Sequence, residues 1–151
     1  MRSDFFFWAM ITYNRPFGYQ TLGVPKGFPL TPEYKAELDD SLATTLPVSG
    51  RIDGFLFDNF DPQFGNDFLE SITDKSPYPL GEITTPVLVI AAEDDPYSNI
   101  ENVRNLAGKF PNARLFVVPD GGHPQLGHGQ EVDGEITQFL NSVVAVTDRS
   151  Q

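Results

Sequence analysis

Acidic residues and a histidine follow two apolar segments, in positions that would let them act together in catalysis. The acidic run 93–95 comes directly after the apolar run 86–92, and His123 follows a second apolar run at 114–118. A carboxylate that accepts a hydrogen bond from an imidazole fixes the tautomer of the ring and stabilises the imidazolium formed during proton transfer. The spacing therefore predicts an acid–histidine pair suited to general acid–base chemistry.

Both apolar runs are predicted to be strands of one parallel sheet. Their short length and their β-branched residues favour strands, and the run 86–92 is apolar throughout, as is typical of a strand buried on both faces. Ligands gather at the carboxyl ends of strands in open parallel sheets. If the two strands are neighbours, the acidic run and His123 therefore meet at one edge of the sheet.

Two amphipathic helices are predicted in the same half of the chain. The first lies between the strands and is capped by Ser98 or Asn99, and the second covers 131–146. Their apolar stripes comprise Val103, Leu106, Ala107 and Phe110 in the first helix and Val132, Ile136, Phe139, Leu140 and Val143 in the second. Strands and helices that alternate with short links imply a right-handed parallel crossover.

The first half of the chain is rich in aromatic residues and is broken by prolines. A short buried helix is predicted over 4–11. Thr31 is predicted to cap a longer helix that Pro47 ends, and a further helix is predicted over 52–60. The apolar stripe of the longer helix comprises Tyr34, Leu38, Leu42 and Leu46.

Residues 84–140 resemble the C-terminal end of an α/β-hydrolase. The resemblance is carried, in this order, by Thr85-Pro86-Val87-Leu88-Val89-Ile90, Ala92-Glu93-Asp94-Asp95-Pro96, Pro111-Asn112-Ala113-Arg114-Leu115, Gly121-Gly122-His123 and Phe139-Leu140. By this resemblance Asp95 falls on the acid of the family's G-x-x-D pattern, with Asp94 as the alternative. Ala92 stands where that pattern commonly has glycine. His123 falls on the catalytic base.

The first half of the chain resembles the helical cap of the same family. Asp4-Phe5-Phe6-Phe7-Trp8 and Leu46-Pro47-Val48-Ser49-Gly50-Arg51 are similar to parts of a cap inserted between the sixth and seventh strands, where such caps line the substrate pocket. The proline-rich stretch 76–81 is the predicted boundary. The resemblance implies an α/β class and a partial α/β-hydrolase fold, with a helical cap over 1–80 and the last parallel strands and helices of the core over 81–151.

The nucleophile motif of the family does not occur in this sequence. In α/β-hydrolases a serine within G-x-S-x-G precedes the acid and the histidine, and the 151 residues contain no G-x-S-x-G. Ser49 has different flanking residues, and Ser98 follows Asp95, so neither fits the motif. Met1 is then expected to be an internal methionine of a longer protein or the start of a truncated reading frame.

The resemblance implies the C-terminal portion of a serine hydrolase that acts on an ester or a related small acyl substrate. His123 would take the proton of a serine outside this chain, Asp95 would orient His123, and no cofactor would be needed. We expect the isolated chain to have negligible esterase activity. The alternative is a non-catalytic partner or relic that completes or binds another chain through an open sheet edge, an edge that also favours self-association.

Composition argues against several other classes of protein. Lys and Arg number 10 against 21 Asp and Glu, so the net charge is −11, which disfavours binding to nucleic acid or to anionic membranes. Cysteine is absent, which excludes disulfides and thiolate sites. The longest apolar run, 5–11, is too short to span a membrane, and no signal cleavage site follows it. A cytoplasmic location is expected.

No metal site is predicted. His123 and His128 lie five residues apart on one loop, and no third strong ligand is fixed beside them. His128 is predicted to order the loop before the last helix, and Glu93 is predicted to be a solvated neighbour of the acid.

Overall fold

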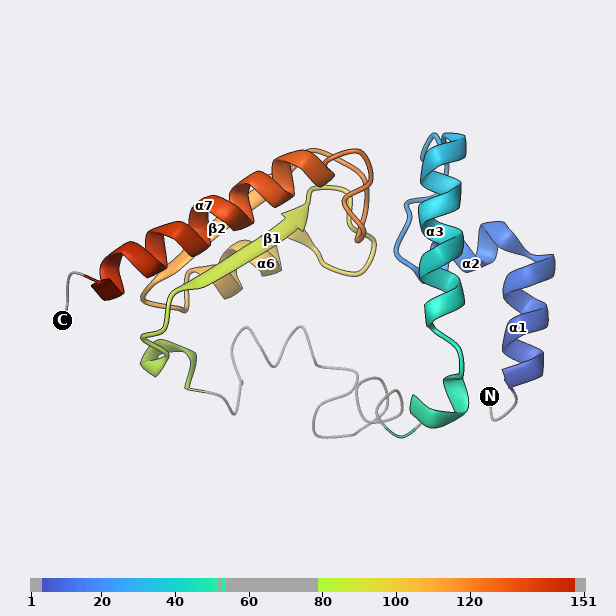
Figure 1. Cartoon of the computed structure of the whole chain (residues 1–151), viewed down its shortest axis with the longest axis horizontal. Helices are drawn as coiled ribbons and strands as arrows, with labels where there is room; N and C mark the ends of the chain where they lie inside the picture. Colours follow the sequence, from blue (N-terminus) through green and yellow to red (C-terminus); the bar gives the residue numbers. More distant parts are fainter. Residues whose placement is uncertain (1–3, 52, 54–78, 149–151) are drawn as a thin grey trace. The chain divides into compact units, whose positions relative to one another are not determined.

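The structure is a computed structural model that describes residues 4–51, 53 and 79–148. Contacts divide the chain into two units, Met1–Pro77 and Tyr78–Gln151, and Figure 1 shows their elements coloured along the sequence. The assignment of the first unit to a cap stays a prediction.

The regular elements in the described part of the first unit are helices. It contains α1 (Asp4–Tyr13), α2 (Arg15–Thr21), α3 (Pro32–Thr44) and the short 3-10 helix η1 (Val48–Arg51). Thr31 caps α3 as predicted, because its Oγ1 accepts a hydrogen bond from the N–H of Tyr34 at 3.2 Å. Leu38 and Leu42, on one face of α3, are at most 1% exposed and form part of the core of this unit. The helix predicted over 52–60 falls almost entirely outside the described residues.

Helix α1 forms where the sequence predicts a helix, but the prediction that this helix is buried is wrong. Ile11 is buried, whereas Phe5 and Phe6 are 73% and 62% exposed. The helix is apolar on nearly every side after Asp4. Its described neighbours α2 and η1 contact only part of that surface, so the remaining aromatic side chains stay uncovered among the described residues.

The second unit has alternating strands and helices, as predicted. It contains the 3-10 helix η2 (Leu80–Glu82), β1 (Val87–Ala92), α6 (Ile100–Ala107), β2 (Ala113–Val118) and α7 (Gly129–Asp148). The strands β1 and β2 pair in parallel, in a register that ends with Ala92 opposite Val118. Helix α6 contacts both strands and α7 contacts β1, and Figure 1 shows α7 running along the sheet. The predicted α/β class is confirmed.

The strands are most deeply buried at their carboxyl ends. Ala92 and Val118 are at most 1% exposed, whereas the first four residues of β1 are only half-buried. The prediction that β1 is buried on both faces along its length is therefore wrong. Within the described residues the sheet has two strands, which leave the first part of β1 without enough cover.

Helix α6 begins at one of the two predicted caps. The Oδ1 atom of Asn99 accepts a hydrogen bond from the N–H of Glu101 at 2.9 Å, so Asn99 rather than Ser98 is the cap. Val103 and Ala107 are buried as predicted. Phe110 lies beyond the end of the helix.

The predicted apolar stripe of α7 divides into two rows. Val132, Phe139 and Val143 are half-buried, as predicted. Ile136 and Leu140, at 37% and 55% exposed, are not buried, and neither is Val144 at 60%. These last three residues recur every four positions and form one row, here called the exposed row of α7. The two strands of the described sheet are too narrow to cover the whole apolar face of a helix, so this row stays exposed.

Candidate acid–base site

The parallel strands bring the acidic run 93–95 beside the turn that carries His123. The paired residues Ala92 and Val118 end the register, and the N–H of Glu93 donates to the carbonyl oxygen of Val118 at 3.0 Å. Both loops therefore leave the sheet at the same edge, where parallel sheets gather ligands.

Asp95 and His123 are in contact at this edge. The Nδ1 atom of His123 lies 2.9 Å from Oδ2 of Asp95. The Asp95 side chain is 4% exposed and the His123 side chain is 57% exposed. An ionised carboxylate only accepts hydrogen bonds, so Nδ1 carries the proton and Nε2 is the basic nitrogen of the neutral ring. Among the described residues, Nε2 has no hydrogen-bond partner, and it is the atom from which proton transfer is possible.

The two neighbouring carboxylates have different partners. Asp95 also uses Oδ1, which accepts from the N–H of Tyr97 at 2.8 Å. Asp94 does not touch the histidine ring in the described hydrogen bonds, and its Oδ1 accepts from the N–H of Gly122 at 2.8 Å. Of the two acids that the sequence leaves open, Asp95 is the one that contacts the ring of His123.

The turn before His123 requires glycine at its first position. Gly121 has a φ of 100° and Gly122 a φ of 65°, which side chains disfavour. A Cβ on Gly121 would lie 2.5 Å and 2.6 Å from the backbone N and O of Leu126. Leu126 is 2% exposed and holds the far side of the turn in the core. The Gly-Gly-His pattern is thus a packing requirement as well as a family resemblance.

Tyr97 is a member of the site that sequence reasoning missed. Its ring meets the ring of His123 edge-on, with centroids 5.7 Å apart and planes at 70°. Burial and the nearby Asp95 carboxylate raise the pKa of the Tyr97 hydroxyl. The sequence feature that could have pointed to Tyr97 is its position two residues after Asp95, in the loop at the carboxyl end of β1.

Comparison with known families identifies the family of the chain. Residues 52–128, about half of the chain, match the model of the alpha/beta hydrolase fold family, and both Asp95 and His123 lie inside the match. The chain belongs to the α/β-hydrolase family. The family resemblance noted in the sequence is therefore confirmed.

A curated relative of this α/β-hydrolase is a poly(3-hydroxyalkanoate) depolymerase from Ectopseudomonas oleovorans. The two proteins are 38% identical over 61 residues, which cover 40% of this chain and 22% of the depolymerase. The similar region thus spans about a fifth of that relative's length. No solved structure matches the chain.

The second histidine, His128, orders the loop before α7, as predicted. Nε2 of His128 lies 2.8 Å from Oδ1 of Asp120, and Nδ1 lies 3.4 Å from Oε2 of Glu131. The His128 side chain is only 15% exposed. The hydrogen bond to Asp120 raises the pKa of His128, partial burial opposes that rise, and the contact with Glu131 adds to it. Both ring nitrogens face carboxylates, and only the imidazolium can donate a hydrogen bond from each of them, so this environment favours the protonated ring.

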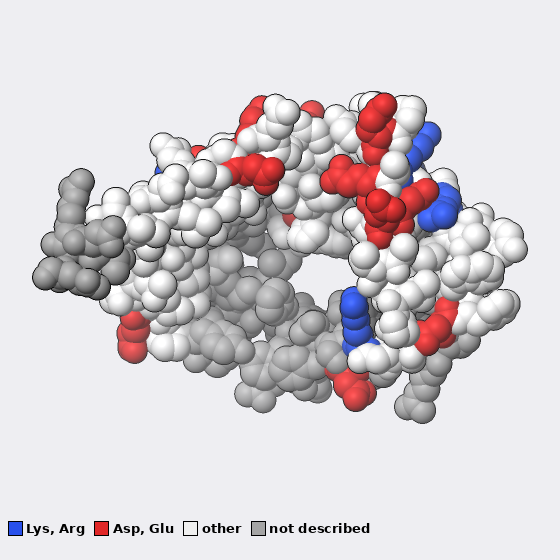
Figure 2. All heavy atoms as spheres, viewed as in Figure 1, with Lys and Arg blue, Asp and Glu red and all other residues white. Residues whose placement is uncertain are grey.

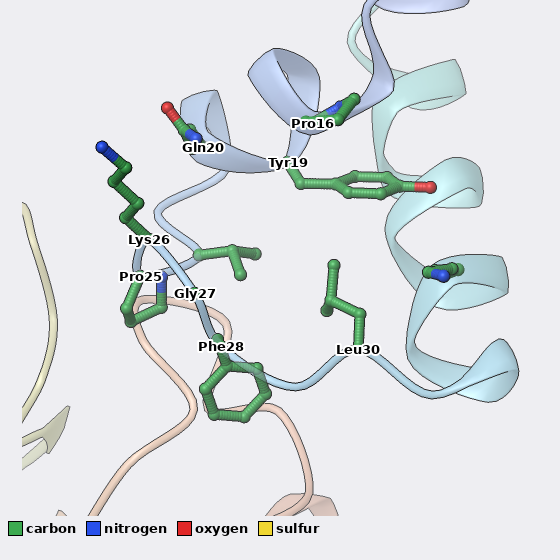
Figure 3. A pocket seen from close by; sticks show the side chains of 10 residues that line it. Pro16, Tyr19, Gln20, Pro25, Lys26, Gly27, Phe28 and Leu30 are labelled. Carbon is green, nitrogen blue, oxygen red and sulfur yellow. The ribbon is translucent and has the colours of Figure 1, made fainter.

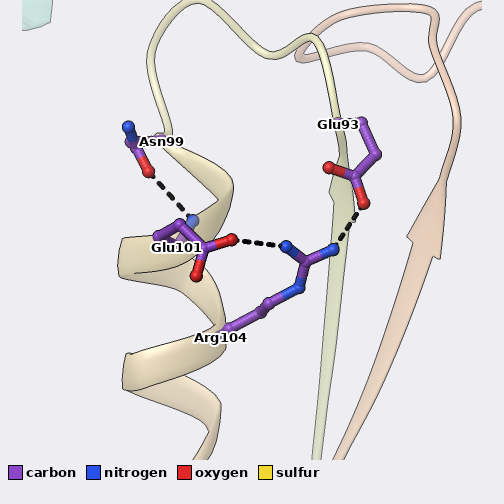
Figure 4. Close-up of polar contacts among 4 residues, drawn as sticks. All are labelled: Glu93, Asn99, Glu101 and Arg104. Atoms are coloured by element: carbon purple, nitrogen blue, oxygen red, sulfur yellow. Dashed lines mark hydrogen bonds and ion pairs between the residues drawn. The ribbon is translucent and has the colours of Figure 1, made fainter.

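Glu93 is exposed to solvent, as predicted, and it also takes part in an ion pair that the sequence did not predict. Arg104 of α6 reaches Oε1 of Glu93 at 2.5 Å and Oε1 of Glu101 at 2.7 Å, as Figure 4 shows beside the Asn99 cap. The Glu93 and Arg104 side chains are 42% and 43% exposed, so solvent screens the pair. The ion pairs tie the loop after β1 to α6.

Ser49 is engaged within the first unit. Its N–H and hydroxyl donate to the two carboxylate oxygens of Asp4, at 2.8 and 2.6 Å. These hydrogen bonds lower the pKa of the Asp4 carboxyl. They fix the start of α1 against η1, which gives Ser49 a structural part.

The first unit also holds a shallow pocket of about 180 Å³. Figure 3 shows Tyr19 on one wall, with Phe28 and Leu30 on the segment that faces it. The Tyr19 hydroxyl donates to Oδ1 of Asp39 at 2.9 Å; burial, followed by that bond, raises the Tyr19 pKa. The lining is mainly apolar and includes Lys26 and Lys35.

Figure 2 shows more acidic than basic side chains on the face in view. In the part of the chain that is described, no helix is both long and apolar enough to cross a membrane. Among those residues, no three histidine or acidic side chains are grouped so that they could hold a metal ion.

Proposed function

We propose that this chain supplies the acid–base portion of a serine-type α/β-hydrolase that acts on an ester or a related acyl substrate. The observation that carries the proposal is the contact of 2.9 Å between a buried Asp95 carboxylate and Nδ1 of the exposed His123. It leaves Nε2 basic, and a nucleophilic hydroxyl needs such a base within reach.

In the proposed reaction, Nε2 of His123 takes the proton of a serine hydroxyl as the serine oxygen attacks the substrate carbonyl. Asp95 keeps the ring in the Nδ1–H tautomer and stabilises the imidazolium. His123 then returns the proton to the departing alcohol, which leaves an acyl-serine. Water, deprotonated by the same nitrogen, attacks the acyl-serine, and the serine oxygen regains that proton from His123 as the carboxylic acid leaves. The serine belongs to the nucleophile motif that residues 1–151 do not contain.

The relative's name suggests a substrate class. The depolymerase is described as acting on poly(3-hydroxyalkanoate), a polyester, and it shares 38% identity with this chain over the matched residues. We therefore choose esters of short 3-hydroxy acids as the first substrates to test, beside a simple activated ester.

The test joins the chain, through its N-terminus, to the preceding part of an α/β-hydrolase that carries G-x-S-x-G. We expect the fusion to hydrolyse 4-nitrophenyl butyrate, and His123→Ala to lower kcat/KM by about 10³-fold or more. Asp95→Asn should also lower it strongly, because the amide no longer enforces the tautomer. Glu93→Gln is the matched control and should keep the activity. An active fusion that is indifferent to His123→Ala would refute the proposal.

The chain alone provides a second test. We expect no turnover of the activated ester above the buffer rate, because the base has no serine to activate. Turnover by the chain alone that disappears in His123→Ala would show that the nucleophile lies within these residues.

A second candidate function is that of a partner that completes a hydrolase made of two chains. It is favoured by the sheet, which has two strands within the described residues, and by the exposed row of α7, in which Ile136, Leu140 and Val144 are 37–60% exposed. A strand edge without a neighbour is open to strand addition. Isolation of the natural complex tests this: a second polypeptide with G-x-S-x-G should co-purify, and its absence would remove the candidate.

A further inference from the structure

The three consecutive acids after β1 each have a different partner in the second unit. Glu93 pairs with Arg104 on α6, and Asp95 contacts the ring of His123. Asp94, between them, accepts from the backbone N–H of Gly122. The acid that the reaction does not use therefore bonds to the residue next to the catalytic histidine.

The contact from Asp94 spans the two loops of the site. Its Oδ1 lies 2.8 Å from the nitrogen of Gly122, in a half-buried position. Gly121 and Gly122 both have positive φ. Glycine loses more conformational freedom on folding than other residues, so this turn needs contacts from outside to fix it. A carboxylate placed two residues after a buried strand end is a stationary acceptor of that kind.

We infer that Asp94 is a positioning residue that holds the turn 121–123 beside β1, so that the ring of His123 meets Asp95. The inference deepens the proposed function and rests on it for its catalytic meaning. The His123 side chain is 57% exposed, and its described ring contacts are Asp95 and the edge of Tyr97. When the backbone bond is lost, the turn moves away and Nδ1 loses its acceptor.

The test follows Gly122 and His123 by NMR in the full, isotopically labelled chain. One readout is the hydrogen-exchange rate of the Gly122 amide. The other is the tautomer of the neutral His123 ring, read from its ring nitrogen shifts at about pH 8.5, well above the ordinary histidine pKa. In Asp94→Ala we expect the Gly122 amide to exchange about tenfold faster or more, and the Nδ1–H tautomer to lose its dominance.

Two variants make the test specific. Asp94→Asn keeps an Oδ1 acceptor at the same place, so it should restore most of the Gly122 protection and of the Nδ1–H tautomer. Glu93→Gln removes the neighbouring acidic charge and an exposed ion pair, and it should leave both readouts as they are in the unaltered chain.

Three results would overturn the inference. Asp94→Ala could leave both readouts unchanged, or it could speed Gly122 exchange without changing the His123 tautomer, which would reduce Asp94 to a stabiliser of the turn. If Asp94→Ala does not fold, a measurement on the unaltered chain tests the inference instead. A scalar coupling across the hydrogen bond, between the Gly122 nitrogen and the Asp94 carboxyl carbon, supports the inference, and its absence overturns it.

These readouts involve no ester hydrolysis, so they separate the inference from the proposed function. An inactive fusion with a tautomer that depends on Asp94 would refute the hydrolase reaction and leave the positioning intact. An active fusion in which the His123 tautomer does not depend on Asp94 would support the hydrolase reaction and refute the positioning role of Asp94.

Discussion

At the scale of single residues, acidic side chains that are neighbours in the sequence differ in burial and in the groups they contact. The Asp95 side chain is 4% exposed and faces a ring nitrogen, whereas the side chain of Glu93, two residues earlier, is 42% exposed and faces an arginine. A buried carboxylate interacts with its partner through less solvent than an exposed one. Asp95 is accordingly the acid from which a loss of function is expected.

The glycine at position 121 gives a prediction about stability. Gly121→Ala should destabilise the second unit by about 2 kcal/mol or more, because alanine disfavours positive φ and its Cβ would collide with the Leu126 backbone. Gly134→Ala, within α7 and with open space around it, is the matched control. It should stabilise by about 0.5–1 kcal/mol. Urea unfolding of both variants, followed by NMR signals of β1 and β2, checks the opposite signs.

The pair formed by His128 and Asp120 gives a prediction about pH. The folded chain has a raised His128 pKa, so its stabilising contribution is complete below the unfolded value of about 6.5 and is lost as the pH rises through the folded pKa. Unfolding free energies measured across this window should fall with pH more steeply in the unaltered chain than in His128→Gln. Identical slopes would contradict the assignment of that ion pair.

At the scale of elements, helix ends are set by local chemistry and can be tested separately. Thr31→Ala should destabilise the first unit by about 1 kcal/mol, since the Tyr34 N–H loses its acceptor. Thr31→Ser keeps the hydroxyl and should be nearly neutral. Thermal unfolding followed by Trp8 fluorescence reports on this unit. Equal losses in the two variants would mean that the hydroxyl does not cap α3.

The elements that the sequence predicts well are those determined by neighbouring residues. The caps Thr31 and Asn99 and the strand pair follow from local patterns and short links. The exposure of an element depends on which other segments pack against it, and a local sequence pattern does not reveal those segments. The open aromatic side of α1, including Phe5, and the exposed row of α7, including Leu140, were for that reason not predictable.

For the candidate site, the sequence predicts which segments meet but not the contacts that each side chain makes. The placement of Asp95 near His123 follows from the strand order, because both residues come after carboxyl ends of neighbouring parallel strands. The division of roles between Asp94 and Asp95 depends on loop geometry after the strand. Sequence spacing does not determine that geometry, and Tyr97 was missed for the same reason.

At the scale of the whole molecule, the two units have more apolar surface than their described contacts cover. The second unit has a sheet of two strands in its described residues and the exposed row of α7. We expect the isolated chain to self-associate, as measured by size-exclusion chromatography with light scattering. Leu140→Lys should shift the distribution toward the monomer. A clean, heat-stable monomer of the unaltered chain would contradict this expectation.

The most direct test of the central claim is to sequence the DNA and the transcript upstream of the codon for Met1. We expect an open reading frame that runs back through G-x-S-x-G, so that serine, Asp95 and His123 follow one another in the chain order of the family. A stop codon in frame directly upstream would contradict the claim that this chain is the C-terminal portion of a hydrolase. It would leave the role of a partner or a relic.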